Sequence, residues 1–194
     1  MLKRILVITF VTLLYSTVFS QTRKKEVAFS ISGFSLLGTS GNFGKGINGV
    51  GLQTALVTNI SHYTAVVLNF TYTTMHGFAI ESVASNYSSY AFVPAIRSIF
   101  LEYYTWNIFT EVGFGLGTLK HNAVDMFLAT DKHSDLGGGI SILKAGLGGT
   151  YKFNESFGIE FFVPITFVQN LSSQKSSHVF HGITPTFGLR YLLN

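Results

Sequence analysis

The spacing of the breaks between apolar segments constrains the fold of this chain more than any other feature. After the first twenty residues, eight segments in which apolar and polar residues mostly alternate run to the last residue. A period of two is typical of strands whose two faces meet different surroundings. The connections alternate between long ones, at 37–48, 75–90, 120–142 and 169–182, and short ones, near Asn59–His62, Tyr103–Trp106 and Asn154–Ser156. A membrane-spanning barrel has this pattern, because its turns are short on one side and its loops are long on the other.

The segments are long enough to cross a bilayer as tilted strands. Each has about 10–13 residues, close to the ~9–11 that a crossing needs and above the ~5–6 of soluble strands. Three prolines, Pro94, Pro164 and Pro185, fall inside these segments and indicate bulges or strand ends, because proline removes a donor from the ladder. The segments are Val27–Leu36, Gly49–Thr58, Tyr63–Thr74, Ala91–Glu102, Asn107–Leu119, Leu143–Phe153, Phe157–Val168 and Ile183–Leu193. The sequence therefore predicts an all-β, eight-stranded antiparallel up-and-down transmembrane β-barrel.

The N-terminus reads as a leader for export. Lys3 and Arg4 precede the apolar run Ile5–Leu14, and Ser20 offers a small-residue cleavage site before Gln21. The run is too short for a comfortable transmembrane helix. We expect a cleavable signal peptide at residues 1–20 and a single barrel domain at 21–194, with a retained N-terminal anchor helix as the alternative.

The composition excludes several classes of protein. Charged residues make up 11% of the chain against about 25% in globular proteins, yet no stretch after the leader approaches 18 uninterrupted apolar residues. High apolarity without a helical span favours a barrel, since lipid forbids unpaired strand edges. Without Lys3 and Arg4 the net charge is only +2, so the charge indicates no nucleic-acid partner. The absence of cysteine excludes disulfides and thiolate zinc sites.

The composition of the two faces of the segments indicates which face meets lipid and which lines the lumen. The face opposite the apolar one is rich in Gly, Ser and Thr and carries too little charge to coat a soluble, lipocalin-like cup. We therefore place the apolar face against lipid and the other in a narrow lumen, which eight strands fill with side chains. The expected lumen charges are Arg97, Glu111, Lys144, Lys152, Glu160 and Arg190. Counted from the turns, Arg97 should approach Glu111, and Glu160 should approach Lys152 and Arg190, whereas Lys144 has no obvious acidic partner.

Aromatic residues gather at the segment ends, as expected for two interfacial girdles. One set lies toward the short turns: Tyr63, Tyr103, Tyr104, Trp106, Tyr151, Phe153 and Tyr191. The other lies toward the long loops: Tyr72, Phe92, Phe167 and Phe180.

Candidate chemistry is confined to the connections. The six histidines are His62 in a short turn and His76, His121, His133, His178 and His181 in the expected long loops. Catalytic groupings could be Ser134 and Asp135 beside His133, or Ser176 and Ser177 beside His178, but nucleophile–base pairing is a spatial relation. We expect no catalytic residue, metal site or cofactor. We assign the lumen charges a structural role, and the alternative is a path for protons or ions.

The leader, the eight segments and the ending Thr186–Asn194 (TFGLRYLLN) resemble the small outer-membrane β-barrel families, most closely OmpX/PorT-like barrel domains. That resemblance implies an integral outer-membrane protein with a structural or surface-interaction role through its outer loops. The implied partners are outer-membrane lipid and lipopolysaccharide, the barrel assembly machinery, and an extracellular or secretion partner. A lipid-modifying outer-membrane enzyme and a small-solute transport barrel are the alternatives.

Overall fold

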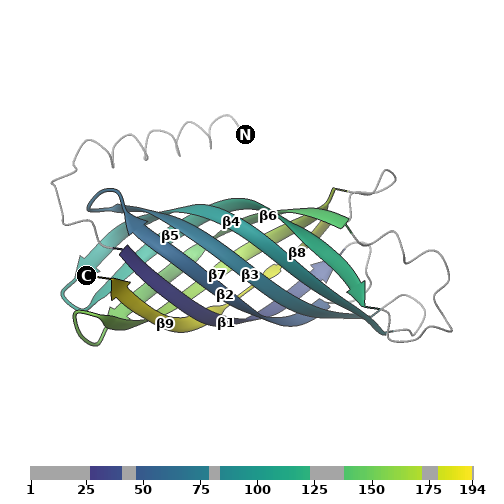
Figure 1. Ribbon diagram of the computed structural model, residues 1–194, viewed down its shortest axis with the longest axis horizontal. Helices are drawn as coiled ribbons and strands as arrows, with labels where there is room; N and C mark the ends of the chain where they lie inside the picture. Colours follow the sequence, from purple (N-terminus) through teal and green to yellow (C-terminus); the bar gives the residue numbers. More distant parts are fainter. Residues whose placement is uncertain (1–26, 41–46, 79–83, 123–137, 172–178, 194) are drawn as a thin grey trace.

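The computed structural model describes residues 27–40, 47–78, 84–122, 138–171 and 179–193 (Figure 1). Within these residues, no helix is long and apolar enough to span a bilayer. The expected signal peptide lies outside the described residues and stays a prediction. The strands are β1 (Val27–Ser40), β2 (Ile47–Asn59), β3 (Thr64–Phe78), β4 (Ala84–Tyr103), β5 (Trp106–Asn122), β6 (Gly138–Lys152), β7 (Phe157–Asn170), β8 (Val179–Ile183) and β9 (Thr186–Leu193).

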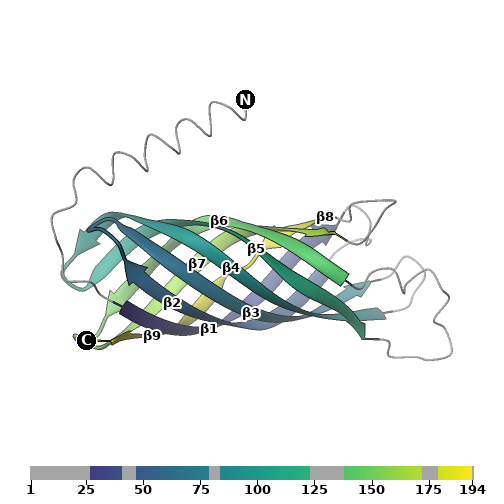
Figure 2. The ribbon, with the colours of Figure 1, turned by 45° about the horizontal axis from the view of Figure 1, so that its top comes forward.

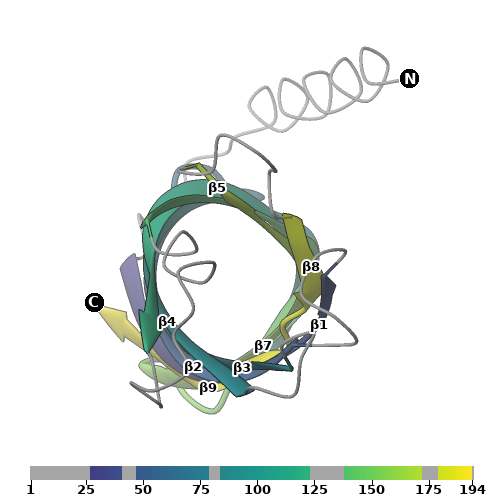
Figure 3. The ribbon, with the colours of Figure 1, turned by 90° about the vertical axis from the view of Figure 1, so that its right-hand side faces the viewer.

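The strands form one closed antiparallel ring (Figure 3). Each strand from β1 to β7 pairs with the next, and β8 and β9 both lie between β7 and β1. The pairs Leu37↔Ile183 and Phe34↔Thr186 keep the same register across the gap between β8 and β9. These two elements are therefore one strand interrupted at Thr184–Pro185, and the prediction of eight strands is confirmed. The strands run obliquely around the barrel axis, as closure requires (Figures 1 and 2).

The prolines act differently from one another. Pro185 interrupts the last strand, as expected, and the neighbouring backbone bonds persist from the Ser35 amide to the Pro185 carbonyl (3.2 Å). Pro94 leaves a gap in the β4–β5 ladder without changing the register. The bulge in β4 lies instead at Phe100, between Ile99 and Leu101. Because a bulge adds one residue to one strand, Phe100 and Leu101 both point outward, which explains the unclear alternation of this segment.

The strands continue into all four of the segments expected to be long loops. The ladder between β1 and β2 extends to Gly38↔Ile47, and that between β3 and β4 extends to Phe78↔Ala84. His76, His121 and His181 therefore lie on strands and not in loops, which corrects that expectation. Polar residues and glycine in these stretches resemble loop sequence because neither face of a strand outside the bilayer has to be apolar. We call this end of the barrel the long-loop end and the opposite end, with connections 60–63, 104–105 and 153–156, the short-turn end.

The outer wall carries the apolar face, as the alternation predicted. Phe29, Leu52 and Phe114 are 44%, 57% and 59% exposed, whereas the inward neighbours Ala28 and Gln53 are buried. A soluble cup would have the opposite arrangement. An apolar outside on a closed barrel is stable in lipid, where every backbone group must be paired within the protein.

The apolar band on the outer wall has an edge at each end. At the short-turn end every residue of the expected girdle is exposed, and Tyr103 stacks near Trp106 with ring centres 6.1 Å apart. At the other edge the ring centres of Tyr72 and Tyr90 lie 4.8 Å apart. The structure does not describe the side chain of Phe180. Beyond this edge the outward residues become polar; they include Asn48, Thr118, Lys120, Gln169 and His181.

Candidate functional site in the barrel lumen

The short-turn half of the lumen is closed by apolar packing. Alanine, valine and leucine side chains from five strands form one buried cluster, and three larger side chains form a second. The rings of Phe109 and Phe162 lie 5.9 Å apart and are fully buried. We call these two clusters the apolar floor; its members are Ala28, Ala55, Val57, Ala65, Val67, Ala95, Ile99, Phe109, Phe162 and Leu192.

Arg97 of β4 is the centre of a buried ionic cluster above the floor. Its Nε and Nη2 donate to Glu111 Oε2 at 3.0 and 2.7 Å. Its Nη1 and Nη2 donate to the two carboxylate oxygens of Glu160 at 2.7 and 2.9 Å. The guanidinium carbon lies 3.8 Å from the centre of the Phe109 ring. Arginine suits this position because its planar fork binds carboxylates in fixed geometry and its face packs on an aromatic ring.

Two amides extend the cluster around the lumen wall. Asn69 of β3 donates to Glu111 at 3.1 Å, and Gln53 of β2 donates to Asn69 at 3.0 Å. The carbonyl oxygen of Gln53 accepts from Lys144 Nζ of β6 at 2.7 Å. Arg190 of β9 closes the other end, 3.5 Å from Glu160. Seven residues on seven strands thus form one chain of hydrogen bonds and ion pairs, which we call the lumen network.

Most of the charges expected in the lumen meet in this network. The pairs Arg97–Glu111 and Arg190–Glu160 are present as expected. Lys152, expected beside Glu160, is half-buried at the end of β6, where its register partner is Gly158. The bond between Arg97 and Glu160 was not expected, because β4 and β7 are not neighbours in the ring and counting from turns compares only adjacent strands.

Gln53 and Asn69 are the network members that the sequence analysis missed. Both lie on buried, inward positions of their strands, and a buried amide must find a hydrogen-bond partner. An amide on the inward face of a strand was therefore the sequence signal that could have identified both residues. Gln53, itself hydrogen-bonded to Asn69, supplies the partner that Lys144 lacked in the sequence analysis.

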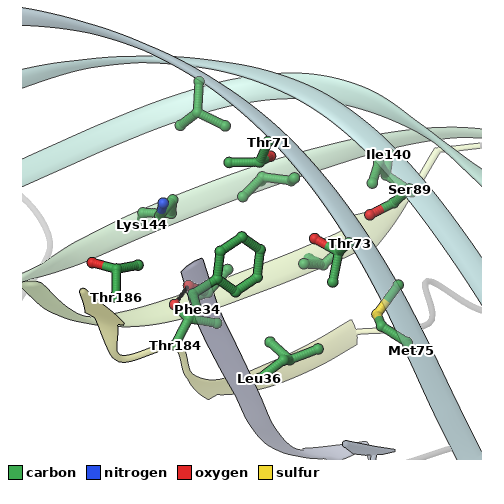
Figure 4. A pocket seen from close by; sticks show the side chains of 14 residues that line it. Phe34, Leu36, Thr71, Thr73, Met75, Ser89, Ile140, Lys144, Thr184 and Thr186 are labelled. Carbon is green, nitrogen blue, oxygen red and sulfur yellow. Dashed lines mark hydrogen bonds between the residues drawn. The ribbon is translucent and has the colours of Figure 1, made fainter. Parts of the chain in front are cut away.

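A cavity of about 50 Å³ lies above the network, in the long-loop half of the lumen. Figure 4 shows its lining side chains converging from strands around the ring. Aliphatic and aromatic groups lie there among hydroxyls, and Lys144 is the one charged residue among the described residues that line it. Four hydroxyls are used within the wall. Those of Thr166 and Thr184 lie 2.7 Å apart, Thr186 donates to the Phe162 carbonyl at 3.0 Å, and Thr71 donates to the Ala91 carbonyl at 3.5 Å. The remaining lining includes Phe34, Leu36, Thr73, Met75, Ser89, Val93, Ile140, Ile142 and Val168.

The serine–histidine groupings of the sequence analysis cannot be placed. Residues 133–135 and 176–178 lie outside the described ranges. Across the described residues, no group of three or more His, Asp or Glu side chains could hold a metal ion. His62 lies at the short-turn end, with its Nε2 3.7 Å from Glu102 Oε2.

Comparison with solved structures identifies the architecture. Neisserial surface protein A superposes with a TM-score of 0.62 at 8% identity, over 85% of this chain and 96% of that one. Ail, the attachment invasion locus protein of Yersinia pestis, gives 0.54 at 14% identity, over 88% and 100%. OprG from Pseudomonas aeruginosa gives 0.53 at 12% identity, over 90% and 99%. The fold is that of a small outer-membrane β-barrel.

This likeness extends to the fold and confirms the expected resemblance at that level. No family model and no curated protein matches the sequence. Together with the apolar outer wall, the fold makes this protein an integral β-barrel of the outer-membrane type. In such a barrel the short-turn end faces the periplasm and the long-loop end faces outside.

Proposed function

We propose that this protein is a non-catalytic outer-membrane barrel whose long-loop end interacts with partners outside the cell. One observation carries the proposal: the strands continue past the apolar band with a polar outer face. In β5, Leu116 is the last outward apolar residue, followed outward by Thr118 and Lys120. From Leu116 to the end of β5 at Asn122, the strand covers about 20 Å, at ~3.3 Å per residue. This extension is paired with β4 as far as Asn86↔Asn122, so it gives a rigid support for contact residues beyond the lipid.

The lumen supports a structural role for the membrane-embedded part. Arg97 and Glu111 are both 2% exposed and bind each other inside the barrel. Buried charges in fixed, reciprocal pairs are suited to holding the wall strands together. A path for ions would instead need groups that exchange partners with water.

The proposed partners follow from the two environments of the barrel. Outer-membrane lipid and lipopolysaccharide contact the apolar wall and its girdles, and the barrel assembly machinery inserts the chain. An extracellular or secretion partner binds the long-loop end. Ail is named for attachment and invasion, and its barrel is similar in fold, which supports a contact role for that end.

Cysteine labelling of whole cells tests this orientation, because the chain contains no cysteine of its own. Lys120→Cys lies on the outward polar face of β5, Phe114→Cys in the apolar band of the same strand, and Glu155→Cys in a short turn. With a membrane-impermeant maleimide, we expect Lys120→Cys to react in intact cells and Glu155→Cys only after lysis. Phe114→Cys is the matched lipid-facing control and should react in neither. Labelling of Glu155→Cys in intact cells would contradict the proposal.

Two further measurements separate the proposal from its alternatives. Mass spectra of lipid A from cells with and without the protein should be identical if the barrel is not lipid-modifying. Planar bilayers containing the purified barrel should show no stable conductance if it is not a pore. A mass shift in lipid A would favour the lipid-modifying enzyme over the proposed contact role. Steady conductance would favour the small-solute transport barrel.

A further inference from the structure

Lys144 lies between the network and the cavity, and the network uses only part of its bonding capacity. The residue is 7% exposed, lines the cavity, and donates one hydrogen bond, to Gln53. An ammonium group has three donors. Among the described residues, the carboxylates nearest to it, Glu111 and Glu160, are both bound by Arg97.

The charge of Lys144 points the same way. Among the described residues, its ammonium group forms no salt bridge, and its hydrogen-bond partner is the neutral amide of Gln53. A buried charge without a counter-charge in contact is costly. One monoanion beside Lys144 would supply that contact.

The rest of the cavity is suited to an apolar group. Leu36 packs with Met75 and Val168 at the part of the cavity toward the long-loop end, and Val93 packs with Ile140 and Ile142 beside it. Figure 4 shows Lys144 and Met75 at opposite sides of the cavity, with Phe34 between them. Thr73 and Ser89 also line it, and neither hydroxyl makes a hydrogen bond within the described residues.

We propose that this cavity binds a short aliphatic monocarboxylate, with the carboxylate on Lys144 and the chain toward Met75. The size of the ligand follows from the volume. Since about 10–15 Å³ of such volume is needed for one water molecule, 50 Å³ holds about four groups of that size. Acetate and propionate, with four and five non-hydrogen atoms, have this size, whereas long-chain fatty acids do not. This site is independent of the contact role proposed for the long-loop end.

Propionate and its neutral isostere propionamide test the site in the full-length barrel in nanodiscs. Carbon-13 NMR titration of labelled propionate should show saturable binding at millimolar concentrations. Intermolecular NOEs from its methyl group to Val93 and Ile142 would locate it in the cavity and separate it from partition into lipid. Propionamide should bind at least about tenfold more weakly, because it lacks the charge-assisted bond to Lys144.

Variants of two lysines complete the test. Lys144→Met should remove the preference for propionate over propionamide, and Lys144→Arg should keep it. Lys120→Met, on the outer face of β5, is the matched control and should bind like the unchanged protein. A heat-modifiable gel shift checks that each variant is folded. Equal binding of the two ligands to the unchanged protein would overturn the proposal whatever the variants do, and so would NOEs confined to outer-wall residues.

Discussion

The two halves of the lumen differ in how their side chains are used. In the short-turn half, the apolar floor and the paired charges of Arg97, Glu111 and Glu160 leave buried groups in contact on every side. In the long-loop half, shorter hydroxyl and aliphatic groups surround a cavity. The same eight strands thus carry a packed half that determines stability and a looser half whose sequence is freer to serve binding.

The largest effect should come from removing the centre of the packed half. Arg97→Met leaves Glu111 and Glu160 buried without their common partner, and breaking such a pair costs about 3–5 kcal/mol. Urea unfolding in lipid vesicles should show a loss of this size in the free energy of unfolding. Arg97→Met combined with Glu111→Gln and Glu160→Gln should recover part of it. A triple variant no more stable than Arg97→Met would show that the cost comes from lost packing and not from unpaired charge.

Phe109→Ala tests the apolar floor itself. The ring is fully buried against Phe162 and under the Arg97 guanidinium, so its removal leaves a void and should cost about 3 kcal/mol. Phe114→Ala, on the lipid-facing side of the same strand, is the control and should cost less, because lipid can fill the space. The measurement is the same unfolding titration. An equal loss for both variants would mean that the floor is no better packed than the outer wall.

Gly148→Ala tests how closely the wall packs on the floor. An added Cβ would lie 2.5 Å from the Phe109 ring and 2.7 Å from the Phe161 carbonyl oxygen. We expect a loss of about 1–3 kcal/mol from overpacking. Gly33→Ala is the matched control, since its Cβ would meet no atom within 4 Å, and it should be neutral or slightly stabilising.

Thr73→Val should have the smallest effect. Its hydroxyl faces the cavity and its substitution changes little volume, so we expect a change below about 1 kcal/mol in the free energy of unfolding. A loss comparable to that of Phe109→Ala would remove the contrast between the two halves.

Much of the fold was predictable because lipid imposes a simple rule on each strand. Every second residue must be apolar inside the bilayer, so alternation revealed the lumen positions of Glu111, Glu160 and Arg190. The rule stops at the membrane edge, which is why the strand positions of His76 and His121 were read as loops. It also breaks at the Phe100 bulge, where one extra residue turns two consecutive apolar side chains outward.

The site was predictable only in part, for a geometric reason. Counting from short turns gave Arg97–Glu111, because β4 and β5 are adjacent. It could not give Arg97–Glu160, which crosses the interior between strands on different sides of the ring. Such a bond depends on the length of the arginine side chain and on the diameter of the closed barrel, and neither is encoded in the spacing of residues.

The bond across the lumen has a consequence for the order of assembly. Arg97 and Glu160 are separated by 63 residues, so they can meet only after the intervening strands have been laid side by side. Local hairpins form without this contact, and closing a long segment of chain is slow. The network therefore contributes little to the first steps of insertion and much to the lifetime of the finished ring. Its effect should appear mainly as slower unfolding.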